Sequence, residues 1–256
     1  MFKNLMASIG IGAAKLRLQL LKSDLRQGEA VQGIVYVEGG KVTQKVDQLY
    51  FHLDISSHYE HNDKLHPFDA TLDTQISSQT FEIESNRFKT EIPFSYTVPF
   101  NIPITAGITK YEFVAGLDIK NAINPNDHVP VKILPCLEVE AILKALDRLG
   151  FRPTRDSGNY NGKVQWLEFR PTEFMRGKLD ELEVAVKINL ANVVLTMEID
   201  KNGKGLTGIL TEALDADEKH VSLTLPKDVL LSGGRPNVEA VEEALRDFLT
   251  RQCGSV

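Results

Sequence analysis

Three of the six histidines of this chain fall within the segment SSHYEHNDKLHPFD, residues 56–69. His58, His61 and His66 are separated by three and five positions. A neutral imidazole is a common zinc ligand, and a zinc site needs three or four ligands at about 2.0–2.3 Å from the ion. A metal-dependent hydrolase that uses these three histidines is therefore one candidate function.

The segment before the three histidines determines how they are held. In VDQLYFHLDISS, residues 46–57, Leu49, Phe51, Leu53 and Ile55 are apolar residues at every second position, which is typical of a strand with one buried face. His52 and Asp54 then point to the opposite, solvent-facing side. The three histidines follow in a polar segment, residues 58–66, that we expect to be a hairpin loop, and a loop alone does not hold metal ligands in place. We therefore expect no metal-ligating residue and no bound zinc, iron or manganese.

Other catalytic patterns are absent from the sequence. It contains no GxSxG, HExxH, Walker or GxGxxG motif in a matching context. In SSH, residues 56–58, neighbouring side chains on a strand point to opposite faces, so a catalytic triad is not supported. Asp215, Asp217 and Glu218 form a polar turn, where the burial that would raise a carboxyl pKa is not expected. We expect no catalytic residue, no cofactor-binding residue and no enzymatic activity.

Composition and charge narrow the class of protein. The chain has 256 residues, 42% of them hydrophobic, and a net charge of -6, which indicates a globular protein of about two domains without a basic surface for nucleic acid. No apolar run approaches the roughly 18 residues of a membrane-spanning helix, and no signal peptide is evident. Cys136 and Cys253 form no CxxC motif and are expected to be free thiols in a reducing compartment. We therefore expect a cytoplasmic protein.

The N-terminal residues form an amphipathic pattern. Phe2, Leu5, Met6 and Ile9 recur at helical spacing, and the glycines that follow would end a short helix. We expect this helix to pack on its own domain, because one basic residue gives little attraction to a membrane surface. Docking on a partner, or binding at a lipid surface, is the alternative.

After these residues the hydrophobic period changes from helical to two. Several short segments alternate between apolar and polar residues and are separated by Gly, Asn, Asp and Pro, which predicts an antiparallel β-sandwich. Gly28 provides a turn conformation, and Pro93, Pro99 and Pro103 restrict their segment to a sheet edge or corner. The predicted strands are residues 15–20, 30–37, 46–57, 80–84, 90–98 and 110–119.

Three of these stretches together are similar to a known family. They are LRQGEAVQGIVYVEGG (25–40), EIPFSYTVPFNIPIT (91–105) and YEFVAGLDIKNAINPNDHVPVKILP (111–135). With the helix and FRP segment that follow, the chain resembles the bacterial sporulation-control proteins over nearly its whole length. The resemblance implies an arrestin-like β-sandwich as N-terminal domain, a family-specific C-terminal domain, and a regulatory or scaffolding role without established catalytic residues.

A helix and a second β-rich domain follow the sandwich. LEVEAILKALDRLG, residues 137–150, has one apolar face and acidic residues near its start, which predicts a connector helix. Trp166 is expected to pack in a core or a domain interface. The run from 181 to 200 is strongly β, and Asn202–Gly203 is a typical hairpin turn. We predict domains at 1–131 and 151–256, with the connector at 132–150.

The chain ends in a predicted amphipathic helix. Its apolar stripe is expected to face the core, and dimerisation through this stripe is the alternative. The residues of the stripe are Val238, Val241, Leu245, Phe248 and Leu249.

The sequence thus predicts a non-enzymatic cytoplasmic adaptor or scaffold that binds other proteins, in sporulation control or a related stress or cell-cycle programme. The pathway follows from the resemblance alone. We expect residues 91–105 and 58–66 of the sandwich to be the candidate binding surfaces. The metal-dependent hydrolase and the lipid-surface protein are the alternatives.

Overall fold

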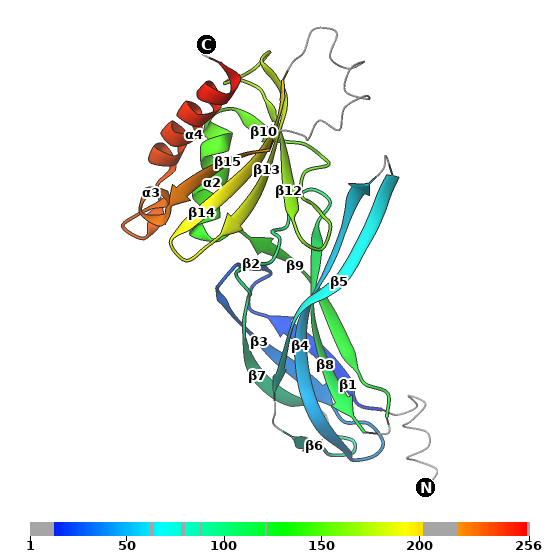
Figure 1. Ribbon diagram of the computed structural model, residues 1–256. Helices are drawn as coiled ribbons and strands as arrows, with labels where there is room; N and C mark the ends of the chain where they lie inside the picture. Colours follow the sequence, from blue (N-terminus) through cyan, green and yellow to red (C-terminus); the bar gives the residue numbers. More distant parts are fainter. Residues whose placement is uncertain are drawn as a thin grey trace. The chain divides into compact units, whose positions relative to one another are not determined.

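The computed structural model describes residues 13–61, 64–77, 80–87, 89–120, 122–201 and 220–254 (Figure 1). The protein is mainly β, with one helix in the middle of the chain and another near its C-terminal end, as predicted. The predicted N-terminal helix with Phe2, Leu5, Met6 and Ile9, the Asn202–Gly203 turn and the acidic residues Asp215, Asp217 and Glu218 lie outside the described residues.

The chain divides into two compact units that are each assembled from separate segments. The first unit contains Met1–Ser56, Pro67–Ile102 and Lys110–Leu134, and the second contains Ser57–His66, Pro103–Thr109 and Pro135–Val256. The chain therefore passes repeatedly from one unit to the other.

Two sheets form the first unit. The smaller has the order β1 (Lys15–Leu20), β3 (Ala30–Glu38), β7 (Thr90–Thr97), and all its pairs are antiparallel. The larger has the order β2 (Asp24–Arg26), β9 (Asn126–Leu134), β8 (Lys110–Ile119), β4 (Gln44–His61), β5 (Lys64–Ser77), with β6 (Phe81–Ile83) also beside β4. The short β2 runs parallel to β9, an exception to the antiparallel pattern that we predicted.

Apolar residues on alternate positions of these strands make the core of the first unit. Val31, Val35 and Val37 of β3 are buried, as their period of two predicts. The two sheets meet through aromatic rings: Phe94 of β7 stacks on Phe51 of β4, with ring centroids 4.3 Å apart. Tyr96 of β7 meets Phe113 of β8 edge to face. This contact between the sheets confirms the predicted sandwich.

Glycine and proline occupy special positions in the smaller sheet. Gly28 has a φ of +79°, the conformation that the sequence predicted for its turn. Pro93 lies in β7, which is the last strand of its sheet, so the N–H that proline lacks is not needed by a further strand. The prediction of an edge segment at this proline is confirmed.

The predicted loop at residues 58–66 is wrong. β4 continues to His61 and β5 begins at Lys64, so most of this segment lies on two paired strands. Sequence patterns missed β5 because its residues are exposed or half-buried along its whole length, which gives no apolar alternation.

A six-stranded antiparallel sheet covered by helices forms most of the second unit. Its strands follow the order β10 (Phe151–Pro153), β12 (Gln165–Pro171), β13 (Leu179–Ile188), β14 (Asn192–Lys201), β15 (Val221–Pro226), and β11 (Asn159–Tyr160) pairs with β12. The helices are α2 (Leu137–Arg148), the short α3 (Lys227–Leu230) and α4 (Val238–Cys253). A small ladder joins β16 (Leu231–Ser232) to β17 (Arg235–Pro236). In Figure 1 both long helices lie on one face of the sheet.

The helix predicted as a connector is part of the core of the second unit. Ala141, Ile142, Ala145 and Leu146 of α2 are fully buried in one cluster with the sheet and α4. A boundary after residue 131 would also cut β9, whose last residues pair with β2. The apolar stripe of α4 belongs to the same core, with Val241, Leu245 and Leu249 buried.

Two shorter segments complete the second unit. Thr109, which is fully buried, shares a hydrogen bond with Ser57 at 2.8 Å and donates its hydroxyl to the carbonyl oxygen of Gly158. The amide of Gln165 donates to the Ile104 carbonyl at 2.8 Å and accepts from the Ile104 N–H at 2.9 Å. Segments distant in sequence are therefore fixed to β12 and the loop before it.

The continuous β segment expected at 181–200 is two strands joined by a turn. β13 ends at Ile188, and β14 starts at Asn192. We missed this turn because its central residues, Leu190 and Ala191, are not typical turn residues. Within the described residues, no helix has the length and hydropathy needed to cross a membrane.

Candidate functional site

The three clustered histidines do not share one loop. His58 lies in β4 and His66 in β5, where the His66 ring stacks on Tyr59 with centroids 5.5 Å apart. His61 ends β4, and its side chain is outside the described part of the chain. Among the described side chains, neither His58 nor His66 belongs to a group of three possible metal ligands. The described side chains of His58 and His66 thus give no geometric support for a metal site.

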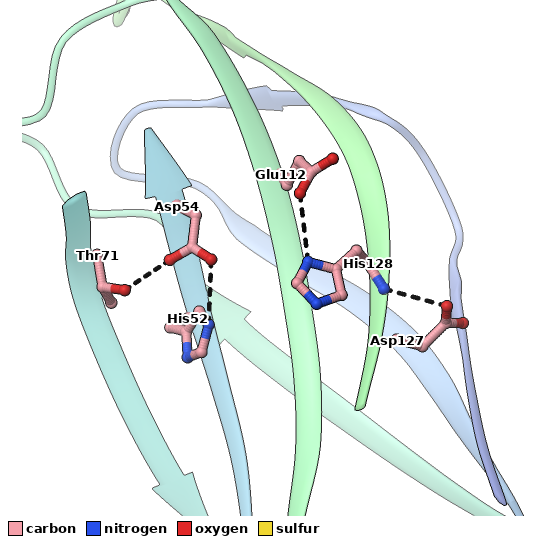
Figure 2. A network of polar contacts seen from close by, with 6 residues as sticks. All are labelled: His52, Asp54, Thr71, Glu112, Asp127 and His128. Atoms are coloured by element: carbon pink, nitrogen blue, oxygen red, sulfur yellow. Dashed lines mark hydrogen bonds and ion pairs between the residues drawn. The ribbon is translucent and has the colours of Figure 1, made fainter. Parts of the chain in front are cut away.

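A different pair of histidines lies on the outer face of the larger sheet. His52 on β4 and His128 on β9 flank Val114 of β8, which is directly opposite each of them in the strand register. We call the side chains of His52, Asp54, Glu112 and His128 the histidine face (Figure 2). The alternation in 46–57 predicted the orientation of His52 and Asp54, and the structure confirms it, because Leu49, Phe51, Leu53 and Ile55 are buried on the other side.

Each histidine of this face contacts a carboxylate. The Nε2 atom of His52 is 3.4 Å from Oδ2 of Asp54, and Asp54 also accepts a hydrogen bond from the Thr71 hydroxyl at 2.6 Å. On the neighbouring strands, Nδ1 of His128 is 3.2 Å from Oε2 of Glu112 (Figure 2). The acidic groups are therefore matched by imidazoles, which become positive when protonated.

Asp127 anchors one end of the histidine face. It accepts a hydrogen bond from the His128 backbone N–H at 3.0 Å (Figure 2). Its other oxygen accepts from the Leu18 N–H at 2.8 Å. Asp127 thus links β9 of one sheet to β1 of the other and fixes the position from which His128 projects.

The rings on this face also cover the central strand. Val114 is 1% exposed although it points outward between His52 and His128. Tyr50 lies above Gly116, where an added Cβ would come within 2.2 Å of the tyrosine ring, and Tyr50 stacks on His52 at 5.5 Å. The histidine face is therefore a packed polar cover rather than an open catalytic cleft.

The second unit carries a contrasting group of charges. Glu168 on β12 is directly opposite Glu183 on β13, and Glu183 is directly opposite Glu198 on β14. Carboxylate oxygens of Glu168, Glu181 and Glu183 lie within 4.8 Å of one another, and we call these three residues the glutamate face. They alternate with Leu167, Leu182 and Val184 of the core, so they project from the side of the sheet opposite the helices.

Burial and like charge determine the protonation of this group. Glu168 is only 9% exposed. Burial, together with the hydrogen bond and negative charge of Glu168 and the charge of Glu183, raises the pKa of Glu181 from 4.5 to about 8. Carboxylate oxygens are the ligands that Mg²⁺ and Ca²⁺ prefer, and a bound cation would reduce the repulsion between the three carboxylates. A proton held by Glu181 reduces this repulsion without a cation. The sequence motif ELE shows two of these residues, but only the strand register brings Glu168 beside them.

Three further residues singled out in the sequence have ordinary surroundings. Burial raises the pKa of the Cys136 thiol to about 11, which keeps it protonated and unreactive near neutral pH. Neither Cys136, which is buried, nor Cys253, which is half-buried, is part of a disulfide among the described residues. Trp166 is half-buried, and its ring stacks on His220 with centroids 5.6 Å apart.

Two sheet edges lie next to each other in the first unit. Among the described strands, β5 and β7 each end their sheet and have one hydrogen-bonded neighbour. Side chains join them: the Gln75 amide donates to the Thr97 carbonyl at 2.9 Å, and the Tyr96 hydroxyl donates to Asp73 at 2.7 Å. β5 is long, with 14 residues.

Comparisons with known proteins agree with the sequence resemblance. A family model described as "Spo0M: SpoOM protein" matches residues 2–203. The "Sporulation-control protein spo0M" of Bacillus subtilis (strain 168) is 33% identical over 258 residues, which cover 97% of this chain and 97% of that protein. The crystal structure of Spo0M from Bacillus subtilis superposes with a TM-score of 0.76 over 94% of this chain and 99% of that one, at 27% identity.

Proposed function

The chain belongs to the Spo0M family of sporulation-control proteins, and we propose that it acts as a non-enzymatic adaptor that binds other proteins in the cytoplasm. The observation that carries this proposal is the pair of neighbouring strands, β5 and β7, that each end their sheet among the described strands. An adaptor needs an accessible surface with a defined binding geometry, and a free strand edge provides one.

The β5 edge suits the binding of an extended peptide. An added strand would pair with the backbone of β5, which gives affinity without strict demands on side chains, while alternate side chains contact the partner. Leu65 and Ile76, near the two ends of β5, are exposed apolar residues that could contact such a peptide. The sequence prediction placed binding in segments 58–66 and 91–105, which include the start of β5 and the whole of β7 except its first residue.

The polar groups of the chain support binding better than catalysis. The imidazoles of the histidine face contact carboxylates and cover an apolar strand, and the thiol of Cys136 is buried with a raised pKa. Both arrangements stabilise the fold. The described side chains therefore favour an adaptor over a hydrolase.

Affinity capture with altered edges tests the proposal. The full chain and a Leu65→Lys, Ile76→Lys double variant would be immobilised and exposed to extract of the native host, and bound proteins would be quantified by mass spectrometry. Positive charges at both ends of β5 should hinder strand addition, so we expect the specifically bound proteins to be lost. Ile123→Lys is the matched control, because Ile123 is an exposed apolar residue that lies outside β5.

Two outcomes would contradict this function. Retention of the same proteins by the double variant would show that β5 is not the binding edge. A purified protein with about one metal ion per chain, lost when His58 and His61 are replaced by alanine, would favour the hydrolase instead.

A further inference from the structure

A buried hydroxyl group beside the glutamate face has no hydrogen-bond partner. Oγ1 of Thr154 has less than 1 Å² of exposed surface, and among the described residues it is the one buried side-chain oxygen or nitrogen without a partner. Burying a hydroxyl without a hydrogen bond is costly, so nearly all such groups in folded proteins have a partner. The Thr154 hydroxyl therefore indicates that something besides the protein chain binds at this point.

The strand register places Thr154 beside the glutamates. β10 pairs with β12 as far as Pro153 and Phe169, and one step further the Thr154 N–H donates to the Glu168 carbonyl at 3.1 Å. Residues directly opposite each other project from the same side of a sheet, with Cβ atoms about 4.5–5.5 Å apart. Glu183 on β13 is the next member of this row, directly opposite Glu168. One hydroxyl and two carboxylates thus project together from three neighbouring segments.

A β-bulge brings in the third carboxylate. The pairing of β13 with β14 shifts between Leu179 and Glu181. In a regular strand Glu181 would share the inward side of Leu179, which is buried. Because of the extra residue, Glu181 lies instead on the side of Glu183, opposite the buried Leu182. The bulge therefore completes the group of three carboxylates, whose oxygens lie within 4.8 Å of one another.

The glutamate face lacks a close cationic side chain for two of its three members. Among the described residues, neither Glu168 nor Glu181 forms an ion pair with a lysine or arginine. Arg170, the next outward residue of β12, interacts with Glu181 from beyond ion-pair distance. Water screens the charge of Glu168 only weakly, because this side chain is almost fully buried. A bound cation would supply the positive charge that the chain does not.

We propose that the glutamate face and the Thr154 hydroxyl bind one Ca²⁺ ion. Carboxylate and hydroxyl oxygens are hard ligands, which suit Ca²⁺ and Mg²⁺ better than zinc or copper. Ca²⁺ binds oxygens at about 2.3–2.6 Å in variable geometry, so two ligands on opposite sides of the ion are about 4.6–5.2 Å apart. The spacing of the three carboxylates therefore suits Ca²⁺ with little movement. Mg²⁺ requires about 2.0–2.1 Å and a near-octahedral shell, so it should bind more weakly.

This site changes the expectation of no metal ligand that we drew from the sequence. It lies apart from the clustered histidines, on strands whose register a sequence pattern does not reveal. It is also independent of the β5 edge, so the adaptor function and the cation site are tested separately. Because the ion would join Thr154 to β12 and β13, bound Ca²⁺ should raise the melting temperature of the protein.

Isothermal titration calorimetry of the full, metal-free chain with Ca²⁺ measures the binding. We expect one ion per chain with a Kd between about 10 μM and 1 mM, and a higher Kd for Mg²⁺. Glu168→Gln keeps the shape of the side chain without its charge and should weaken Ca²⁺ binding at least about tenfold. Glu183→Gln tests the same loss if circular dichroism shows that Glu168→Gln is unfolded. Glu112→Gln is the matched control, because Glu112 is also directly opposite a carboxylate, that of Asp54.

A Thr154→Val variant distinguishes a ligand from a structural hydroxyl. Valine has a similar shape and no oxygen, so Ca²⁺ affinity should fall at least about threefold. In the absence of Ca²⁺ the melting temperature should be unchanged or higher, because a buried hydroxyl without a partner has been removed. Unchanged Ca²⁺ affinity would show that the hydroxyl is not a ligand, whatever its effect on stability.

The sole tryptophan of the chain can report where the ion binds. Trp166 lies two residues before Glu168 and projects from the same side of β12. Tb³⁺ binds at Ca²⁺ sites and emits light when a nearby excited tryptophan transfers energy to it. We expect Tb³⁺ emission on excitation of Trp166, loss of this emission when Ca²⁺ is added, and loss of it in Trp166→Phe with Ca²⁺ affinity unchanged.

Four results would overturn the calcium site. They are the absence of Ca²⁺ binding up to about 10 mM, tenfold above the highest expected Kd; equal Ca²⁺ affinity of Glu168→Gln, or of Glu183→Gln in its place, and Glu112→Gln; Mg²⁺ binding as tight as that of Ca²⁺; and bound Tb³⁺ that is not excited through Trp166.

Discussion

The histidine face and the glutamate face occupy comparable positions but balance charge in opposite ways. Both consist of side chains on neighbouring strands, and both lie on the side of a sheet away from its core. On the histidine face, Asp54 and Glu112 each contact an imidazole. On the glutamate face, Glu168 is directly opposite Glu183, and Glu181 is beside both.

This difference shows that strand register brings charges together and that residue type decides the consequence. Side chains directly opposite each other in a sheet have Cβ atoms about 4.5–5.5 Å apart, and like charges at that distance are destabilising. On the histidine face, Asp54 and Glu112 are also directly opposite each other, but each of these carboxylates contacts an imidazole. The glutamate face avoids the cost of like charges by holding a proton, so its contribution to stability depends on pH.

The largest expected effect on stability comes from adding a carboxylate to the histidine face, so that it resembles the glutamate face. Val114→Asp places a carboxylate at an almost fully buried position near Glu112, and we expect a loss of about 3 kcal/mol in the free energy of unfolding at pH 8. Val114→Asn is the matched control, since it has the same shape without the charge. Urea unfolding at pH 5 and pH 8 measures both. Equal losses for the two variants at both pH values would show that charge is not the cause.

A smaller effect should follow from removing the charge of Glu181. Its folded pKa is raised from 4.5 to about 8, so the folded state binds more protons than the unfolded state between these values, and stability falls as pH rises through this range. Glu181→Gln cannot ionise. We expect it to be more stable than the unaltered protein by about 1 kcal/mol at pH 9, allowing for screening by solvent, with this advantage absent near pH 4.

Thermal unfolding of both proteins from pH 4 to pH 9 measures this difference. Glu239→Gln on α4 serves as a control for the loss of one exposed acidic group. If the stability of the Glu181→Gln variant relative to the unaltered protein does not grow with pH, Glu181 does not hold a proton in the folded state as we expect.

The smallest effect is expected from breaking a pair on the histidine face. His128 and Glu112 are both exposed, and exposed ion pairs contribute little, so His128→Gln should change the free energy of unfolding by less than about 0.5 kcal/mol. A double-mutant cycle with Glu112→Gln isolates the pair. A coupling above about 2 kcal/mol would show that this pair holds the two strands together and is not a surface contact.

Much of the fold could be predicted from the periodicity of apolar residues. β3, β7 and β8, and the helices α2 and α4, alternate apolar and polar residues or carry an apolar face and were expected close to their observed ends. β5 was missed because its residues are exposed or half-buried along its whole length. The turn at 189–191 was missed because its central residues, Leu190 and Ala191, are not typical turn residues.

The polar sites were less accessible to prediction, since they depend on which strands are neighbours. The outward direction of His52 follows from alternation on a single strand. The contact between His128 and Glu112 requires the register of β8 with β9, and the meeting of Glu168 with Glu183 requires that of β12 with β13. Alternation along one strand carries no information on the register between two strands.

The interleaved assembly of the two units has a consequence for the order of folding during synthesis. β2 leaves the ribosome early but must wait for its partner β9, more than 100 residues later in the chain. Ser57 and Thr109 likewise emerge well before Gly158, to which Thr109 is bonded. The first unit is complete only when all of β9 has been made, so we expect a nascent chain that stops at residue 131 to remain protease-sensitive, and protection to appear first in chains that include all of β9.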